Sequence, residues 1–230
     1  MDAIILAGGL GTRLRQTVPD IPKAMALING RPFLTFLLNY LHRFGFKKVV
    51  LATGHLHHKI EEFIGRSYCG LAIEYSAEDE PLGTGGGIKL ALSKTESETV
   101  LIMNGDTFYD VDVASLVTLH REKDAHLTLA LKPMRDISRY GIVRFKGTRV
   151  TGFEEKQPVA HGHINGGIYV ANRNLFDGFD FPEKFSFEED FLKPHVSRVE
   201  IHCLVSDGYF IDIGVPDDYR RAQVELKAYE

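Results

Sequence analysis

DAIILAGGLGTRLRQTVPDIPK, residues 2–23, passes from an apolar run directly into a cluster of glycines and then into positive charge. The run at residues 2–7 predicts a buried strand, because it is short, apolar and bounded by glycine. Residues 8–23 then carry three cations and a single acid, in a chain whose formal net charge is −4. A strand followed by a glycine-rich loop and cations is typical of a loop whose backbone N–H groups hold phosphate.

Outward from this stretch, short β-branched segments alternate with helical patterns through the first half of the chain. Strands are predicted at residues 2–7, 47–53, 71–77, 99–106 and 126–132. Helices are predicted at residues 31–44, 57–64, 84–93 and 113–123. Since strands that alternate with helices form βαβ units, we expect an α/β, Rossmann-like fold with a mostly parallel mixed sheet and helices on both faces.

The pattern changes after Lys132. Strand-like segments separated by glycine-bearing turns follow, with no long helix between them, at residues 140–145, 149–156 and 163–171. These segments predict a small antiparallel β subsheet at one edge of the main sheet. Ser186, followed three residues later by Glu189, predicts a capping box at the start of a short helix, and residues 215–229 predict a closing helix.

Length and composition indicate an ordinary globular protein. The 230 residues are 44% hydrophobic and 25% charged, and we expect one domain with an α/β half, 1–132, and a β-rich half, 133–230. A pI near 6.2 argues against a nucleic-acid partner. No apolar run approaches the ~20 residues of a membrane helix, and the N-terminus lacks the basic region of a signal peptide. A cytoplasmic protein without a membrane partner is therefore expected, and a homodimer is left open.

Two common phosphate-binding motifs do not fit the opening loop. The P-loop pattern GxxxxGK[ST] is absent, and the dinucleotide pattern GxGxxG begins at Gly9 and Gly11 but meets Leu14 at its third glycine position. The pattern that remains, GGLGTR followed by PK at residues 22–23, resembles the GGxGTR…PK signature of the sugar-nucleotide pyrophosphorylases, a family of nucleotidyltransferases. The resemblance extends over nearly the whole chain, as far as DIGVPDDY at residues 212–219.

The resemblance implies that the opening loop binds a nucleoside triphosphate. Nucleotide contacts are implied for Leu6, Ala7, Gly8, Gly9, Gly11 and Thr12. Arg13 and Lys23 are the implied catalytic residues. A guanidinium fork suits the oxygens of the leaving pyrophosphate, and the lysine suits the α-phosphate and the incoming sugar phosphate. Because the reaction brings two anions together, these cations would neutralise and align them. Arg15 is either a further phosphate contact or a solvated residue.

Two acids that close apolar strands are the implied metal ligands. Asp106 ends the MNGD segment at the carboxyl edge of the sheet, where open α/β sheets hold ligands, and the preceding Asn104 and Gly105 are implied nucleotide contacts. Asp212, in YFIDIG, matches the second metal ligand of the family. Mg²⁺ takes one or two carboxylates together with phosphate oxygens and water, and is therefore the expected cofactor.

The segment AEDEPLGTGGG, residues 77–87, is implied to hold the nucleobase, with Gly83 and Thr84 close to it. Glu78 stands where relatives that use pyrimidines commonly carry glutamine. A carboxylate only accepts hydrogen bonds, and guanine presents two adjacent N–H donors that match it. Uracil and thymine would turn carbonyl groups towards the carboxylate, and a buried acceptor left unpaired costs about 1–3 kcal/mol. We therefore expect the nucleotide to be GTP.

Three motifs in the β-rich half resemble the sugar-phosphate site of the family. Tyr140 and Gly141 match a turn whose glycine contacts the sugar. Glu154 and Lys156 match the EKP motif, in which the acid binds sugar hydroxyls and the lysine binds the sugar phosphate, although Gln157 here precedes the proline. Asn165 matches the sugar contact of the NxGxY motif.

The resemblance thus implies an enzyme that transfers GMP from GTP to a sugar 1-phosphate, with residues 1–132 binding the nucleotide and residues 133–230 the sugar phosphate. Similarity to compact members of the family favours D-glycero-α-D-manno-heptose 1-phosphate, which would give GDP-heptose for surface-polysaccharide biosynthesis. On physical grounds mannose 1-phosphate with GTP stays open, as do an amino-sugar 1-phosphate with UTP and a phosphorylated alcohol in a cytidylyltransferase. The alternative of a different class is a non-catalytic nucleotide-sensing subunit. The joint presence of four residues argues against it: Arg13, Lys23, Asp106 and Asp212.

Overall fold

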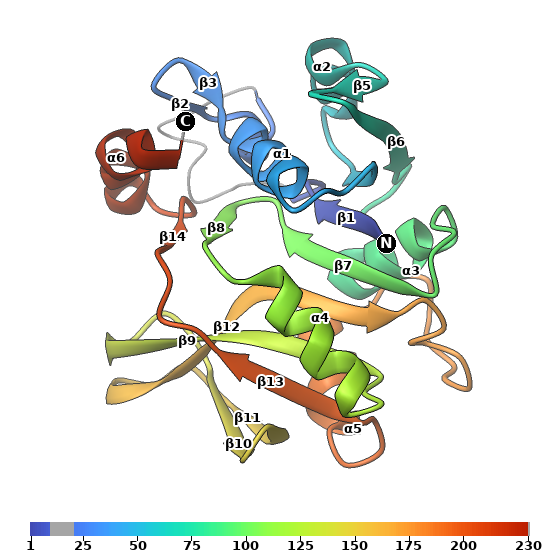
Figure 1. Cartoon of the computed structure of the whole chain (residues 1–230), viewed down its shortest axis with the longest axis vertical. Coiled ribbons are helices and arrows are strands. Elements are labelled where there is room, and N and C mark those ends of the chain that lie inside the picture. The colour runs from blue at the N-terminus through green and yellow to red at the C-terminus, as the bar shows by residue number, and fades with distance from the viewer. Residues whose placement is uncertain (10–20, 230) are drawn as a thin grey trace.

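The computed structural model describes residues 1–9 and 21–229 (Figure 1). The helices are η1 (Lys23–Met25), α1 (Phe33–Arg43), α2 (His57–Ile64), α3 (Gly83–Leu92), α4 (Val113–Glu122), η2 (Phe187–Leu192), α5 (Lys193–His195), α6 (Pro216–Glu225) and η3 (Leu226–Tyr229). The main sheet contains β1 (Asp2–Leu6), β4 (Lys48–Thr53), β5 (Ser67–Tyr68), β6 (Leu71–Ala77), β7 (Thr99–Asn104), β9 (Leu127–Ile137), β10 (Ile142–Lys146), β11 (Arg149–Glu154), β12 (Val159–Asn172) and β13 (Ile201–Val205). Two small sheets pair β2 (Leu27–Ile28) with β3 (Arg31–Pro32) and β8 (Thr107–Tyr109) with β14 (Phe210–Asp212). None of the described helices is long and apolar enough to cross a membrane.

The main sheet has a parallel region at its centre. Its strands lie in the order β10-β11-β13-β9-β12-β7-β1-β4-β6-β5. β1 pairs in parallel with β7 and with β4, and β4 pairs in parallel with β6. The predicted Rossmann-like α/β fold is confirmed, and the carboxyl ends of these four strands therefore meet at one edge of the sheet.

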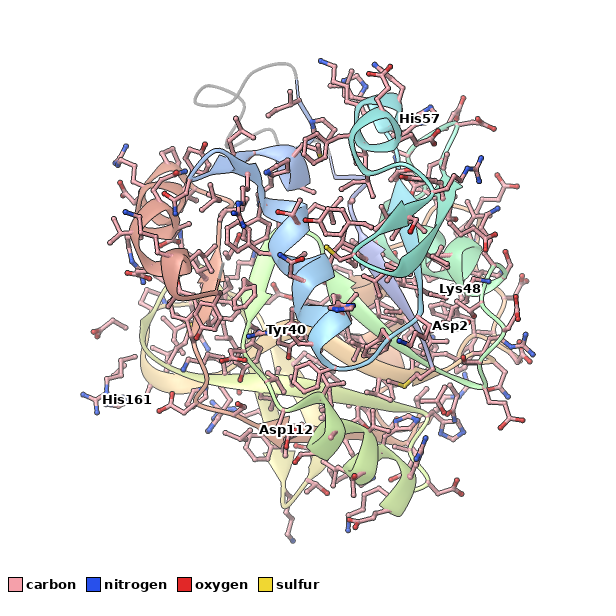
Figure 2. The ribbon with its side chains drawn as sticks, turned by 45° about the horizontal axis from the view of Figure 1, so that its top comes forward. Asp2, Tyr40, Lys48, His57, Asp112 and His161 are labelled. Atoms are coloured by element: carbon pink, nitrogen blue, oxygen red, sulfur yellow. The ribbon has the colours of Figure 1, made fainter. Side chains whose placement is uncertain are left out.

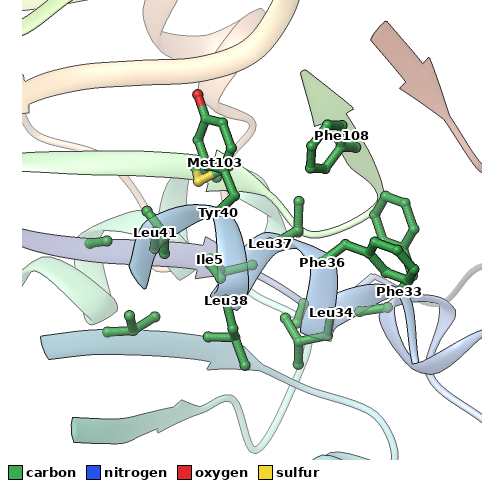
Figure 3. Packing of buried hydrophobic residues seen from close by; sticks show 14 of the residues in the cluster. Ile5, Phe33, Leu34, Phe36, Leu37, Leu38, Tyr40, Leu41, Met103 and Phe108 are labelled. Carbon is green, nitrogen blue, oxygen red and sulfur yellow. The ribbon is translucent and has the colours of Figure 1, made fainter. Parts of the chain in front are cut away.

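Both faces of β1 are buried, as expected for the central strand of a parallel sheet. Ala3 and Ile5 pack on the face that α1, α2, α4 and α6 cover, whereas Ile4 packs on the opposite face with α3 and η2. α1 contributes leucines at positions 34, 37, 38 and 41, the spacing that forms one apolar stripe on a helix, and Figure 3 shows them beside Ile5 and Met103. Helices on both faces are thus confirmed.

The connection from β8 into α4 is fixed by two polar anchors. The Asp112 carboxylate caps α4 by accepting the N–H of Ala114 at 3.0 Å and the hydroxyl of Ser115 at 2.6 Å, at the helix start labelled in Figure 2. On α1, the buried Tyr40 hydroxyl donates to the carbonyl of Val111 at 2.5 Å. These bonds hold the chain that follows Asp106 against α1.

The antiparallel strands continue the main sheet rather than forming a separate layer. β12 lies between β9 and β7 and is antiparallel to both, and β10 and β11 extend the sheet beyond β13. β12 has 14 residues and β9 has 11, so each runs from the centre of the sheet into the antiparallel edge. The pairing of β12 with β9 is interrupted between Asn165 and Tyr169, where β12 bulges.

The segment that begins at Ser186 starts as predicted but winds differently. The Ser186 hydroxyl accepts the N–H of Glu189 at 3.1 Å, as predicted, but the reciprocal bond of the capping box differs, because the N–H of Ser186 donates to Asp190 Oδ2 at 2.6 Å. The six residues that follow form a π-helix, a wide turn that is rare and often found at functional sites. Its buried rings, Phe187 and Phe191, stack on each other and join a phenylalanine cluster that also contains Phe176, Phe179, Phe181 and Phe185.

We expect Phe191→Ala to lower the free energy of unfolding by about 3–5 kcal/mol, because its ring is fully buried in this cluster and its removal leaves a cavity. The matched control is Phe63→Ala, since the Phe63 side chain on α2 is 56% exposed and its loss should change stability by less than ~0.5 kcal/mol. Urea unfolding of both variants measures the difference, and equal midpoints would contradict this role of the cluster.

Candidate active site

The glycine-rich loop and the MNGD segment lie side by side because β1 and β7 are neighbours. Leu6 pairs with Asn104 in the parallel register, and the Leu6 carbonyl accepts the N–H of Gly105 at 2.9 Å. A Cβ on Gly105 would lie 2.5 Å from that carbonyl oxygen, so only glycine allows this approach. The chain at residues 7–9 is thereby held next to Asp106.

A cavity with a volume of about 310 Å³ opens at this edge of the sheet. It is lined by Leu6, Ala7, Gly8, Gly9, Lys23, Ala24, Ala52, Glu78, Pro81, Gly83, Thr84, Gly87, Asn104, Gly105 and Asp106. The structure thus brings together nine residues for which the sequence predicts nucleotide contacts, from three separate segments of the chain. Four further residues named from the sequence as phosphate or nucleotide contacts lie outside the described residues: Gly11, Thr12, Arg13 and, as one alternative, Arg15.

Glu78 stands at the wall of this cavity beside the start of α3. One carboxylate oxygen accepts the N–H of Leu82 at 3.0 Å, and the other lies so close to Gly87 that a Cβ there would be 2.5 Å from it. Burial raises the pKa of the Glu78 carboxyl, and the hydrogen bond from Leu82 opposes that rise. The glycine in α3 therefore leaves the space in which this acceptor sits.

Lys23 lies between the two predicted metal ligands. Its Nζ is 2.5 Å from Asp106 Oδ2 and 3.5 Å from Asp212 Oδ1, and its side chain is only 11% exposed. The two acids meet because β14 pairs with β8, with Asp212 opposite Thr107. All three charged groups thus come together although they are far apart in the sequence.

Gly214 completes this contact. Its N–H donates to Asp212 Oδ1 at 2.7 Å, and a Cβ at this position would lie 2.7 Å from both that oxygen and Lys23 Nζ. The glycine of the DIGVPDDY segment therefore allows the acid and the lysine to approach each other.

Tyr140 connects the β-rich half to the same acid. Its hydroxyl donates to Asp212 Oδ2 at 3.3 Å, and burial followed by the charge of Asp212 raises the pKa of Tyr140. The neighbouring Arg139 pairs with the buried Asp218 of α6. The two residues therefore tie the turn before β10 to the segment that carries Asp212.

A second, smaller cavity with a volume of about 160 Å³ adjoins the first. The two share Leu6, Thr84 and Asn104 in their walls. The other lining residues of the smaller cavity are Tyr140, Gly141, Asn165, Tyr169, Phe187 and Glu188. Three of these, Tyr140, Gly141 and Asn165, are predicted sugar-phosphate contacts. Sequence reasoning missed Tyr169 and Glu188, although both lie in segments that it singled out.

Two predicted sugar-phosphate residues do not line this cavity. The Glu154 carboxylate is paired with Arg144, which donates from Nε at 2.6 Å and from Nη2 at 2.9 Å. Lys156 is exposed and does not line the cavity, while Glu154 faces the neighbouring strand. In the described part of the chain, no group of three or more His, Cys, Asp or Glu side chains is placed to hold a metal ion.

Comparison with known proteins identifies relatives that match this chain from end to end. Residues 2–228 match the family model described as Nucleotidyl transferase. The chain is 50% identical over 229 residues, 100% of either sequence, to a D-glycero-α-D-manno-heptose 1-phosphate guanylyltransferase of Aneurinibacillus thermoaerophilus. A protein of the same name from Campylobacter jejuni is 46% identical over 220 residues, 95% of this chain and 97% of the relative. The crystal structure of HddC from Yersinia pseudotuberculosis complexed with GMP-PN is similar with a TM-score of 0.86 at 34% identity, over 98% of this chain and 99% of that one.

We expect Gly87→Ala to weaken GTP binding at least fivefold without loss of stability. The new methyl group would displace the Glu78 carboxylate, while alanine favours the α3 helix. Gly152→Ala is the matched control, because a Cβ at this strand position meets nothing within 4 Å. Titration calorimetry with GTP measures the affinity, and an unchanged dissociation constant for Gly87→Ala would contradict the part assigned to Glu78.

Proposed function

Since the chain belongs to the nucleotidyl transferase family, we propose that it transfers GMP from GTP to D-glycero-α-D-manno-heptose 1-phosphate, forming GDP-heptose and pyrophosphate. The observation that carries this proposal is the 50% identity with the Aneurinibacillus guanylyltransferase over the whole of both chains. The product would serve the biosynthesis of surface polysaccharides.

The two adjoining cavities support a division of labour between the halves of the chain. Residues 1–132 supply nearly the whole wall of the larger cavity, which we assign to GTP, with Glu78 accepting the N–H groups of guanine. Residues 133–230 supply most of the wall of the smaller cavity, which we assign to the sugar phosphate. The shared wall at Leu6, Thr84 and Asn104 would bring the reacting phosphates close together.

In the proposed reaction a phosphate oxygen of the sugar 1-phosphate attacks the α-phosphorus of GTP. The new P–O bond forms as the bond to the oxygen that bridges the α- and β-phosphates breaks, and pyrophosphate leaves. Lys23 lines the larger cavity beside Asp106, so its ammonium group can neutralise the α-phosphate and the incoming anion. Arg13, assigned from the sequence motif alone, would neutralise the leaving pyrophosphate.

The residues around Lys23 suit a divalent metal ion. The carboxylates of Asp106 and Asp212 are 38% and 21% exposed, converge on one cation and supply the oxygen ligands that Mg²⁺ prefers. Magnesium held by these two acids would withdraw charge from the α-phosphate. Tyr140 would keep Asp212 oriented through its hydroxyl.

A panel of sugar 1-phosphates crossed with four nucleoside triphosphates tests the proposed substrates. GTP with the heptose 1-phosphate should give the highest kcat/KM for pyrophosphate release, because the Glu78 carboxylate pairs with guanine and repels the carbonyls of pyrimidines. Faster turnover with UTP or dTTP would contradict the nucleotide assignment. Faster turnover with mannose 1-phosphate would contradict the sugar assignment alone.

Replacing both acids, Asp106→Asn with Asp212→Asn, should lower Mg²⁺-dependent pyrophosphate release at least about 100-fold, because the variant keeps the shape of the site but loses both charged ligands. Asp217→Asn is the control, since this acid of α6 is 83% exposed and pairs with Arg220. Its rate should stay within twofold of the wild type. Full Mg²⁺-dependent activity in the double variant would rule out this metal site.

A further inference from the structure

The smaller cavity contains an acid to which the family signature assigns no role. Glu188 belongs to η2, between the buried Phe187 and the exposed Glu189. Phe187, Phe191 and Leu192 fix the apolar side of this π-helix in the core, and Glu188 lines the cavity together with Asn165 and Tyr169. The wide turn thus adds a carboxylate to the wall of the site.

The Glu188 carboxylate is poorly compensated by the protein around it. Burial raises its pKa, while the charges of Lys193 and Lys156 oppose the rise. Within residues 1–9 and 21–229 it accepts no hydrogen bond from a backbone or side-chain donor. A ligand in the cavity is therefore positioned to supply a hydrogen-bond donor to this half-buried carboxylate.

Tyr169 offers the complementary group. Its hydroxyl oxygen accepts Asn165 Nδ2 at 2.7 Å, so its own proton remains to be donated, and among the described residues it has no acceptor in hydrogen-bond contact. Burial and then the charge of Glu188 raise the pKa of Tyr169, and both side chains line the smaller cavity. An acceptor and a donor therefore stand together in one wall, which suits a sugar hydroxyl because it both donates and accepts.

Two ion pairs of Lys193 join the segment that carries Glu188 to the segment that carries Lys156, which is predicted to bind the sugar phosphate. Lys193 Nζ pairs with Glu189 at 2.7 Å and also with Glu155. Glu189 adjoins Glu188 in the chain, and Glu155 adjoins Lys156. The ammonium group of Lys193 thus joins η2, which carries Glu188, to the end of β11, next to Lys156.

We propose that Glu188 is a further sugar-binding and specificity-determining residue, which accepts a hydroxyl proton of the sugar while Tyr169 donates to the oxygen of that hydroxyl. This inference rests on the proposed function, since it takes the ligand of the smaller cavity to be a sugar 1-phosphate. It adds to the signature residues a contact that discriminates among sugars by their hydroxyl groups.

Glu188→Gln tests the proposal in the full chain, because it keeps the side-chain shape and removes the charge. We expect KM for the sugar 1-phosphate to rise about tenfold, with KM for GTP within twofold of the wild type. The matched control is Glu122→Gln, because this acid of α4 is exposed and lines neither cavity, so both KM values should stay within twofold.

Monodeoxy analogues of D-glycero-α-D-manno-heptose 1-phosphate identify the contact. For the analogue that lacks the bound hydroxyl, KM should be high with the wild type and no higher with Glu188→Gln. For every other analogue, Glu188→Gln should again raise KM about tenfold above the wild-type value. An unchanged sugar KM in Glu188→Gln, or an equal rise in KM for GTP, would overturn the inference. Failure of the wild-type enzyme to form any GDP-sugar would instead overturn the proposed function.

Discussion

The ammonium group of Lys23 is the point at which three remote segments of the chain meet. It contacts Asp106 at the end of β7 and Asp212 at the end of β14. Without a cation between them, two carboxylates brought together by strand pairing would repel each other. The backbone reinforces the same junction, because the N–H of Ile213 donates to the carbonyl of Asp106 at 3.0 Å. Lys23 and Asp106 line the larger cavity, and Tyr140, which donates to Asp212, lines the smaller one, so this junction adjoins both cavities.

The first half of the fold could be predicted from local patterns because its central strands β1, β4 and β7 are buried on both sides. The apolar run at residues 2–7 and the leucines at 34, 37, 38 and 41 have spacings that fit one kind of element each. The residues that line the larger cavity could be predicted from these strands, because neighbouring parallel strands end at the same edge of the sheet. Glu78 and Asn104 therefore meet there although 26 positions separate them in the sequence.

The second half of the fold was harder to predict because its strands pair with segments that are far away in the sequence. β13 was missed as a strand, and the insertion of β12 between β9 and β7 leaves no local signal. Glu154 matches a signature, yet its carboxylate is paired with Arg144 of the adjacent strand, which only the register determines. For the segment that contains Glu188, the sequence predicted only a capped short helix. Over six residues, the spacing of apolar side chains does not distinguish an α-helix from the π-helix that turns Glu188 towards the cavity.

The pairing of β8 with β14 also determines when the site can exist during synthesis. Most of the larger cavity is encoded in the first half of the chain, but Asp212 follows more than a hundred residues later. A ribosome-bound chain that has emerged only as far as β12 can therefore form the strand ends and cannot form the contact between Lys23 and Asp212. Long-range pairings of this kind close late and slowly during folding. Competence for catalysis would then coincide with completion of the fold, so that a nascent or truncated chain would not consume nucleotide.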